Sequence, residues 1–463
     1  MASSLWQRAK GFFGREDKDA PPDATAPLLE QAVTHHKKGR LAEAGTLYEQ
    51  VLAAQPDHAV ALNLLGVLAG QTGNAVRSAQ LLEHAIQIDP SQPGFHSNLA
   101  LALNQLSRGR DAIASCERAI ALDPDCVEAH SNKGTALWGL GRREEALESY
   151  AKAVAADPGH ADTHWNEGYL RMQLGQFETG WKKQEWRWKL ERTRPDWRAF
   201  TQPRWLGKED LRGKTILLYA EQGLGDTIQF CRYAKRVAAL GATVVLEVQR
   251  PLRTLLEGLE GVSTLVSRGE PLPAFDYHCP LLSLPLAFNT TLESIPADQP
   301  YLRPTSSDSA RWQSLLGPKT RPRVGVVWQA ATADRSVPLA DLLRLVTRDK
   351  HFFSLQPDVA PGDQALLDAR KDILQPSLGV RNFADAPLVE LMDLVITADT
   401  SMAHVAGALG KPVWVMLLFN PEWRWMLERE DSPWYPTARL FRQPAPGDWV
   451  SVVERVRSEL AKL

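Results

Sequence analysis

The chain has 463 residues, a hydrophobic fraction of 44% and a formal net charge of −2, from 53 Lys and Arg against 55 Asp and Glu. This length is too great for one ordinary core and predicts about three domains. The balanced charge argues against a nucleic-acid-binding protein, which usually carries a basic face. The sequence also lacks an apolar run of about 18 residues, so we expect no membrane span.

The cysteines and the N-terminus indicate a cytoplasmic protein. Cys116, Cys126, Cys231 and Cys279 form neither a CxxC pair nor a zinc-like pattern with histidines, so we expect reduced, buried thiols. Residues 1–23 resemble no secretory signal and are expected to form a disordered arm. The aromatic and basic side chains of residues 1–15 could instead contact a membrane surface as an amphipathic helix.

Residues 24–194 contain a repeat of constant length. Prolines recur at a step of 34 residues, which is typical of the tetratricopeptide repeat (TPR), a helix–turn–helix unit. They are Pro56, Pro90, Pro124 and Pro158. The turns inside the helix pairs are expected at Gly39, Gly73, Ser107, Gly141 and Gly175. We therefore predict an all-α solenoid of about five repeats, whose tryptophan-rich last repeat packs against the next domain.

Two further residue types keep the phase of the repeat. Small residues are expected where paired helices approach closely: Ala44, Ser78, Ala112 and Ala146. Asparagines recur from the second repeat at a step of 34 or 35 residues: Asn63, Asn98, Asn132 and Asn166. These amides could bind a peptide backbone in the groove, or they could be satisfied inside the solenoid. TPR grooves generally bind peptides or proteins, so we expect such a partner.

The pattern changes after a polar, proline-interrupted linker at residues 195–212. Short apolar runs then alternate with helical segments over residues 213–312 and again over 321–447, and a helical pattern covers 448–463. Such alternation predicts parallel, doubly wound sheets, here two Rossmann-like lobes with a cleft at the carboxyl ends of their strands. The expected strands are 214–220, 243–248, 275–280, 323–328, 352–355, 391–396 and 412–416.

Two segments at predicted strand ends carry polar chemistry. Residues 399–401 (Asp-Thr-Ser) precede a helix, whose N-terminus would suit a pyrophosphate, with His404 one turn further on. Residues 221–226 (Glu-Gln-Gly-Leu-Gly-Asp) form a turn whose glycines, Gly223 and Gly225, permit close approach of a ligand. In the competing interpretation, Thr400, Ser401 and Asp226 only cap their helices.

Four segments, residues 221–230, 278–285, 399–412 and 432–436, together resemble bacterial TPR-linked glycosyltransferases. These enzymes are related to the heptosyltransferases of glycosyltransferase family 9, have the two-lobed GT-B architecture, and are distantly similar to protein O-GlcNAc transferases. The resemblance implies a metal-independent transferase. It would move a sugar, with inversion, from a nucleoside-diphosphate donor to an acceptor recruited by the TPR arm, a protein among the candidates.

The resemblance also implies roles for individual residues. Asp226 would be the general base, with Glu221 in reserve. Nucleotide-sugar binding would involve Asp399, Thr400, Ser401, His404, Arg335, Ser336 and Gln356. The loop before Arg335 is shorter than in the family, and Pro357 stands where the family commonly has lysine.

Other motifs exclude some chemistry and leave alternatives open. The α/β region has no Asp-x-Asp, no GxGxxG and no Walker motif, so we expect no metal, no dinucleotide cofactor and no NTPase activity. The first alternative is a non-catalytic TPR adaptor with a degenerate α/β domain. The second is a transferase of lipopolysaccharide or capsule assembly.

Overall fold

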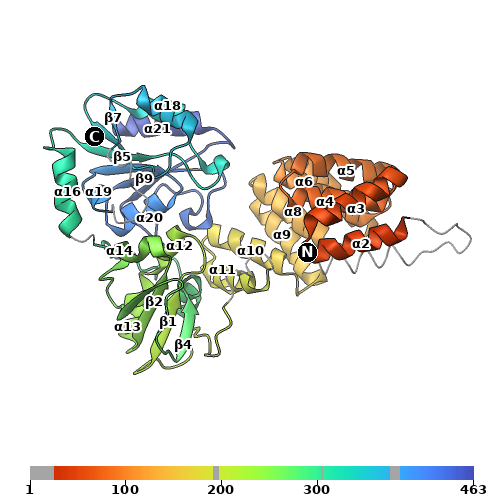
Figure 1. Cartoon of the computed structure of the whole chain (residues 1–463), viewed down its shortest axis with the longest axis horizontal. Helices are drawn as coiled ribbons and strands as arrows, with labels where there is room; N and C mark the ends of the chain where they lie inside the picture. Colours follow the sequence, from red (N-terminus) through yellow and green to blue (C-terminus); the bar gives the residue numbers. More distant parts are fainter. Residues whose placement is uncertain (1–24, 191–197, 304–305, 376–385) are drawn as a thin grey trace, which may run out of the picture. The chain divides into compact units, whose positions relative to one another are not determined.

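The computed structural model describes residues 25–190, 198–303, 306–375 and 386–463 (Figure 1). The chain divides into two compact units: Met1–Leu170 with Trp186–Arg194, and Arg171–Glu185 with Pro195–Leu463. The first is helical and the second contains two parallel sheets, which confirms the predicted combination of an all-α region with an α/β region. The predicted arm at residues 1–23 lies outside the described residues.

The first unit is built from helix pairs of nearly constant length. Each second helix ends two residues before one of the repeating prolines, because proline lacks the N–H that a continuing helix would need. The pairs are α2 (Ala26–Lys37) with α3 (Leu41–Ala54), α4 (Ala59–Gln71) with α5 (Ala75–Ile88), α6 (Pro93–Gln105) with α7 (Gly109–Leu122), and α8 (Val127–Gly139) with α9 (Arg143–Ala156).

The turns inside the pairs have a left-handed backbone at every predicted position. The φ angles at Gly39, Gly73, Gly141 and Gly175 lie between 72° and 85°, and the serine of the third copy, Ser107, has φ 58°. Glycine adopts this conformation without a steric penalty, whereas serine does not. The turn prediction is therefore confirmed, and the third repeat has a strained turn.

Close packing explains the small residues. Ala44, Ala112 and Ala146 have no exposed surface, and Ser78 is 2% exposed. A β-carbon on Gly134 of α8 would lie 2.6 Å from the Tyr150 ring of α9. The helices of a pair thus interlock small residues with large ones, as predicted from the repeat.

The fifth helix pair is divided between the two units. Helix α10 (Ala161–Gln173) begins in the first unit, whereas α11 (Phe177–Gln184) belongs to the second, and the 3₁₀ helix η1 (Glu185–Lys189) follows. In the second unit, Trp181 packs on Phe177 and Trp423, and its Nε1 donates to the Thr290 carbonyl at 2.9 Å. The tryptophans were expected to pack against the next domain, but this division differs from the predicted boundary at residue 194.

The first lobe of the second unit holds a four-stranded parallel sheet in the order β3-β2-β1-β4. The strands are β1 (Thr215–Tyr219), β2 (Thr243–Val248), β3 (Thr264–Ser267) and β4 (Tyr277–Pro280). The helical elements are α12 (Leu224–Phe230), α13 (Tyr233–Ala239), η3 (Arg250–Leu252), α14 (Arg253–Leu256), η4 (Leu281–Ser283) and α15 (Leu284–Ala287). The order reverses between β1 and β4, the kind of position where open α/β sheets bind ligands.

The second lobe holds a six-stranded parallel sheet in the order β10-β9-β8-β5-β6-β7. The strands are β5 (Arg323–Val327), β6 (His351–Ser354), β7 (Ile373–Leu374), β8 (Leu394–Ala398), β9 (Val413–Leu417) and β10 (Ala438–Arg442). The helical elements are α16 (Ser306–Leu316), η5 (Ala333–Arg335), α17 (Leu339–Leu342), η6 (Leu343–Leu345), α18 (Pro361–Asp368), α19 (Ala386–Glu390), α20 (Ser401–Ala408), η8 (Trp423–Trp425) and α21 (Trp449–Leu460). Here the order reverses between β5 and β8.

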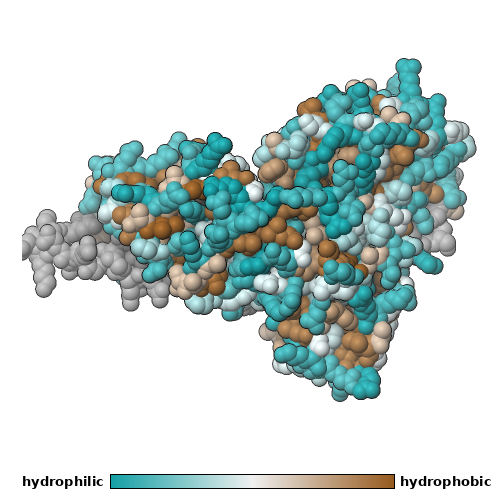
Figure 2. All heavy atoms as spheres, turned by 180° about the vertical axis from the view of Figure 1, so that it is seen from behind, coloured by the Kyte–Doolittle hydropathy of each residue, from teal (hydrophilic) through white to brown (hydrophobic). Residues whose placement is uncertain are grey.

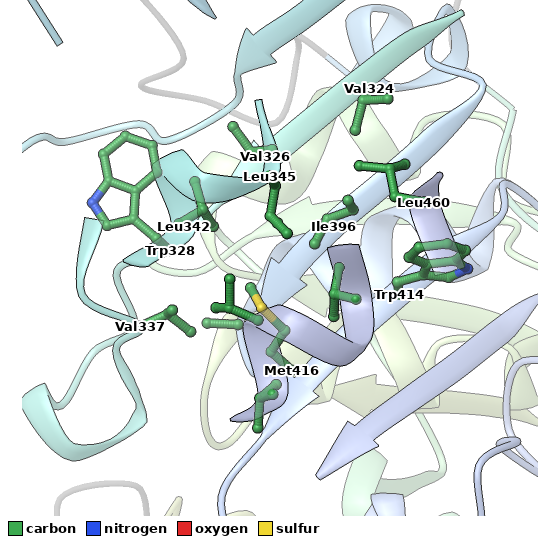
Figure 3. Close-up of a cluster of buried hydrophobic side chains, with 14 of the residues drawn as sticks. Val324, Val326, Trp328, Val337, Leu342, Leu345, Ile396, Trp414, Met416 and Leu460 are labelled. Atoms are coloured by element: carbon green, nitrogen blue, oxygen red, sulfur yellow. The ribbon is translucent and has the colours of Figure 1, made fainter. Parts of the chain in front are cut away.

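The core of the second lobe lies between its sheet and the covering helices (Figure 3). Strand residues Val324, Ile396 and Met416 pack there with Leu342 of α17 and Leu460 of α21, all at most 2% exposed. The helix predicted over residues 448–463 is therefore present as α21, and it packs on the second lobe.

Few of the large apolar side chains that the structure describes are exposed. In Figure 2, hydrophilic residues cover much of the visible face and hydrophobic ones appear in groups between them. The most exposed apolar side chains among the described residues include Val76 at 56% and Leu315 at 62%. No helix in the described part of the chain combines the length and the apolar character needed to cross a membrane.

Candidate functional site

A cavity of about 1230 Å³ lies in the second unit, lined by residues of both lobes. Its second-lobe wall follows the carboxyl ends of β5, β6 and β8, which include the reversal of strand order. The first lobe contributes the N-terminus of α12 and Pro251. Ten residues singled out from the sequence line it: Gly223, Gly225, Asp226, Arg335, Ser336, Gln356, Asp399, Thr400, Ser401 and His404.

Glu221, the reserve base, is not among the lining residues. Its side chain is 3% exposed, and its Oε1 accepts a hydrogen bond from the Leu282 backbone at 3.2 Å. Leu282 closely follows β4 in the chain, so Glu221 joins the two strand ends at which the first sheet reverses its order. The structure thus places this carboxylate in the interior of the first lobe.

Helix α20 begins at the cavity. Thr400 is its N-cap, and the Thr400 Oγ1 accepts from the Met402 backbone at 3.2 Å. The preceding residue, Asp399, is 8% exposed, and its Oδ1 accepts from the Trp425 indole at 2.8 Å. Burial raises the pKa of Asp399, against the lowering effects of the Trp425 hydrogen bond and two arginines. The capping role considered for Thr400 is therefore present, and the same residue faces the cavity.

His404 lies one turn into α20, 3% exposed. Its Nδ1 is 2.8 Å from the Tyr435 hydroxyl, and its ring stacks on Trp425. Burial lowers the pKa of His404 well below its usual range, and nearby arginines add to this effect. The ring is thus neutral at physiological pH and can act as a hydrogen-bonding group. A β-carbon on Gly225 would lie 2.8 Å from His404 Cδ2, so this glycine allows α12 to approach α20.

Asp226 uses both carboxylate oxygens. Its Oδ2 accepts from the Gly223 backbone at 2.9 Å, which caps α12, and its Oδ1 accepts from the Arg424 guanidinium at 2.5 Å. Asp226 therefore caps its helix, and it also lines the cavity. An ion pair to an arginine of the other lobe was not predicted.

Arg424 comes from η8 of the second lobe and is 8% exposed. Its Nη2 pairs with Asp226, and its Nη1 lies 3.1 Å from Glu422 Oε2. Burial, reinforced by Asp399 and Asp226, raises the pKa of Glu422 to about 8, although Arg424 opposes the rise. One guanidinium therefore serves two carboxyl groups at the edge of the cavity.

The short loop after β5 is held by its own hydrogen bonds. Ser336 Oγ accepts from the Ala330 backbone and donates to the Thr332 carbonyl, each at 3.0 Å. Gln356 Oε1 accepts from the Gln329 backbone at 2.9 Å, so both predicted donor ligands also shape this loop. Arg335 is 32% exposed, with its Nη1 3.9 Å from Asp399 Oδ2, which leaves the cation accessible from the cavity.

Three residues that contact predicted site residues were missed from the sequence. Arg424 and Trp425 belong to the segment Trp423-Arg-Trp425, whose two tryptophans are buried; no motif of the sequence pointed to it. Tyr435 stands in the 432–436 segment, which was used only for the resemblance. No local spacing connects these residues with Asp226, Asp399 or His404, because their contacts depend on the tertiary fold.

In the first unit, the asparagines connect neighbouring repeats. Asn98 Nδ2 donates to Asn63 Oδ1 at 2.8 Å, and Asn132 Nδ2 donates to the Ser97 carbonyl at 3.0 Å. The structure thus favours satisfaction inside the solenoid for these three. A second contact recurs in α6, α8 and α10, where a histidine Nε2 hydrogen-bonds the carbonyl of the preceding proline. The pairs are His96 with Pro90, His130 with Pro124 and His164 with Pro158.

Among the residues that the structure describes, no group of three His, Cys, Asp or Glu side chains is arranged to hold a metal ion. The four cysteines are buried and free of disulfides. Burial raises the pKa of Cys116 and of Cys231 to about 12, so both thiols stay protonated at neutral pH.

Comparison with known proteins identifies the repeats. The tetratricopeptide repeat model matches residues 22–93 and 97–161, so the N-terminal region of this protein consists of TPR repeats. The chain is 28% identical over 327 residues to the protein FlbA of Caulobacter vibrioides, a match that covers 62% of this chain. It covers 53% of FlbA, so the chain spans about half the length of this relative.

Three solved TPR structures are each similar to a little more than a third of this chain. MamA is 22% identical with a TM-score of 0.29, covering 36% of this chain and 97% of MamA. A thermophilic TPR protein of Thermus thermophilus is 20% identical with a TM-score of 0.35, covering 37% of this chain and 94% of that protein. YrrB, described as a TPR protein with an unusual peptide-binding site, is 21% identical with a TM-score of 0.29, covering 37% of this chain and 88% of YrrB.

Proposed function

We propose that the second unit is a metal-independent glycosyltransferase of the GT-B type, and that the TPR repeats recruit its acceptor. The observation that carries the proposal is the cavity between strand ends, in which a helix N-terminus and an arginine lie on one wall and a carboxylate on the other. These are the groups that transfer from a nucleoside-diphosphate sugar requires.

The donor side belongs to the second lobe. An anionic diphosphate gains from the positive end of α20, from the hydroxyls of Thr400 and Ser401, and from Arg335. Arg335 suits the leaving diphosphate because it is 32% exposed and only loosely paired, 3.9 Å from Asp399. The buried, neutral His404 completes this wall as a hydrogen-bonding group.

The acceptor side belongs to the first lobe. Asp226 takes the proton of the acceptor hydroxyl as the acceptor oxygen bonds to the anomeric carbon. The bond from that carbon to the phosphate oxygen breaks, and the nucleoside diphosphate leaves with the electron pair. Attack from the face opposite the leaving group inverts the anomeric centre. The proton stays on the Asp226 carboxyl until it passes to solvent.

The TPR repeats supply the binding arm for a protein or peptide acceptor. TPR solenoids present long curved surfaces built from successive helix pairs. The neighbour YrrB is described as having a peptide-binding site. Recruitment through a separate arm lets the reaction use remote binding energy, so the cavity itself needs few contacts with the acceptor.

A titration of nucleoside diphosphates tests the donor site. Thermal unfolding of the full chain is followed with ADP, CDP, GDP, UDP and dTDP, and then with the sugars of the best diphosphate. We expect saturable stabilisation by one of them, weakened about tenfold or more in Arg335→Ala, because a charge-assisted hydrogen bond is lost. Arg370→Ala is the matched control, since Arg370 is 34% exposed, pairs with Asp372 and does not line the cavity.

The outcomes separate the candidate functions. Stabilisation of the wild type and of Arg370→Ala, lost in Arg335→Ala, supports a working donor site. If none of the diphosphates binds at millimolar concentration, the proposal fails, and a non-catalytic TPR adaptor becomes the better account. If a donor binds, acceptor screening separates a protein substrate from a lipopolysaccharide or capsule glycan.

A further inference from the structure

We infer that Arg424 is a positioning residue for which Asp226 and the donor diphosphate compete, so that donor binding releases the Asp226 carboxylate to act as a base. The inference rests on the proposed function and adds an order to it, with donor before acceptor. It concerns a residue that neither the sequence motifs nor the resemblance singled out.

The geometry places the guanidinium between two acidic groups, one from each lobe. Arg424 lines the cavity from the second lobe and reaches across to Asp226 of the first lobe at 2.5 Å. Its other terminal nitrogen lies 3.1 Å from Glu422. The charge of Arg424 also acts on Asp399, the residue before α20, since it opposes the rise of the Asp399 pKa.

The state of Asp226 explains why an exchange is needed. One of its oxygens caps α12 through the Gly223 backbone and the other is bound to Arg424. A carboxylate held in this way has its lone pairs directed at existing donors, so neither oxygen is available to an acceptor hydroxyl. Release of Arg424 leaves the cap in place and frees Oδ1 to accept the proton of an acceptor hydroxyl.

A diphosphate provides the competing partner. Its oxygens, placed at the N-terminus of α20, lie on the same wall as Arg424, and guanidinium groups bind phosphates in a forked geometry. Glu422 holds the other nitrogen of Arg424, so the side chain can exchange one ligand while it keeps the second.

A double-mutant cycle on diphosphate binding tests the exchange. Dissociation constants of the best nucleoside diphosphate, and of inorganic pyrophosphate as a base-free probe, are measured by calorimetry on the full chain. Asp226→Asn should tighten binding about three- to tenfold, because it removes the competitor for Arg424. Arg424→Gln should weaken it about tenfold or more. In the double variant the gain from Asp226→Asn should disappear.

The cycle distinguishes exchange from simpler explanations. If loss of a nearby negative charge were the only cause, Asp226→Asn would tighten binding equally with or without Arg424, and the inference would be overturned. The matched control cycle uses Arg429→Gln and Asp431→Asn, a neighbouring ion pair at 2.7 Å outside the cavity, which should not affect binding. Arg424→Lys, which keeps the charge, serves where the glutamine variant fails to fold.

The inference and the proposed function fail separately. If the wild type binds neither a nucleoside diphosphate nor pyrophosphate, the donor site itself is wrong and the inference falls with it. If the wild type binds and the two substitutions are additive, the donor site stands and the exchange at Arg424 is refuted.

Discussion

The raised pKa of Glu422 makes a quantitative prediction about stability. Glu422→Gln should stabilise the second unit, and the gain should grow with pH. Glutamine has the same shape and can still accept hydrogen bonds from Arg424, whose backbone N–H donates to Glu422 at 3.0 Å. The variant therefore removes the ionisation and keeps the packing.

The direction follows from proton linkage. Glu422 has a pKa of about 8 in the folded protein, against about 4.5 when unfolded. Between these values the folded state holds the proton and the unfolded state has lost it. The wild type therefore gains stability from this group below about pH 4.5 and loses it progressively as the pH rises to about 8, whereas the glutamine variant shows no such slope.

The magnitude follows from the size of the pKa change. At about 1.36 kcal/mol for each pKa unit, the upper limit is about 5 kcal/mol. The Glu422 side chain is 16% exposed and its Oε2 lies 3.1 Å from Arg424 Nη1, so water and the guanidinium partly stabilise its ionised form. This lowers the gain below the upper limit. We expect about 2 kcal/mol at pH 8, or about 4 °C in the melting temperature of a unit of this size.

Calorimetric melting curves between pH 4.5 and 8 test this prediction. The two units need not unfold together, and the transition of the TPR unit then serves as an internal reference. Glu257→Gln is the control, because its side chain is 52% exposed and surface substitutions change stability by less than about 0.5 kcal/mol. A difference between variant and wild type that stays constant with pH would refute the reasoning. A less stable variant at pH 8 would show that Arg424 holds Glu422 ionised.

Two further predictions concern glycine positions in the two units. Gly225→Ala should destabilise the second unit by about 1–3 kcal/mol, because its methyl group would lie 2.8 Å from His404, a buried ring with a fixed partner. Gly362→Ala in α18, with no atom within 4 Å of the added carbon, should be neutral or slightly stabilising; equal melting temperatures for both variants would contradict this. In the TPR unit, Ser107→Gly should relieve the turn at φ 58° and stabilise by about 0.5–1 kcal/mol, while Gly141→Ser at φ 77° should destabilise by a similar amount. Urea unfolding of the four variants measures these changes, and a destabilised Ser107→Gly would show that its turn is unstrained.

The sequence predicted those helices, turns and strands whose residues carry the signal within the segment itself. The TPR helices and turns follow from a 34-residue period with glycine and proline at fixed places, and β1 and β2 follow from continuous apolar runs. Strand β3 was missed because Thr264–Ser267 is only four residues long and begins with an exposed threonine. The helical segment between β1 and β2 is divided into α12 and α13, since Cys231 and Arg232 interrupt it.

The site was predictable where it lies at strand ends. Asp399 directly follows β8, and Gln356 lies two residues after the end of β6. Parallel strands bring such positions together at one edge of a sheet. Arg424 was not predictable in the same way. It reaches Asp226 over 198 residues of sequence, and only the packing of η8 against α12 establishes that contact.

The alternatives weighed for Asp226 and Thr400 turn out to be compatible. Each residue caps a helix with one hydrogen bond, through Asp226 Oδ2 and Thr400 Oγ1, and each still lines the cavity. A cap fixes the backbone and the rotamer of the side chain that makes it, and a fixed side chain loses less entropy when it binds a ligand. Capping therefore prepares these residues for a binding role, and evidence for the cap does not count against the site. In the proposed mechanism Asp226 can act as a base only after Arg424 releases its second oxygen, and for this reason the exchange at Arg424 is the step to measure.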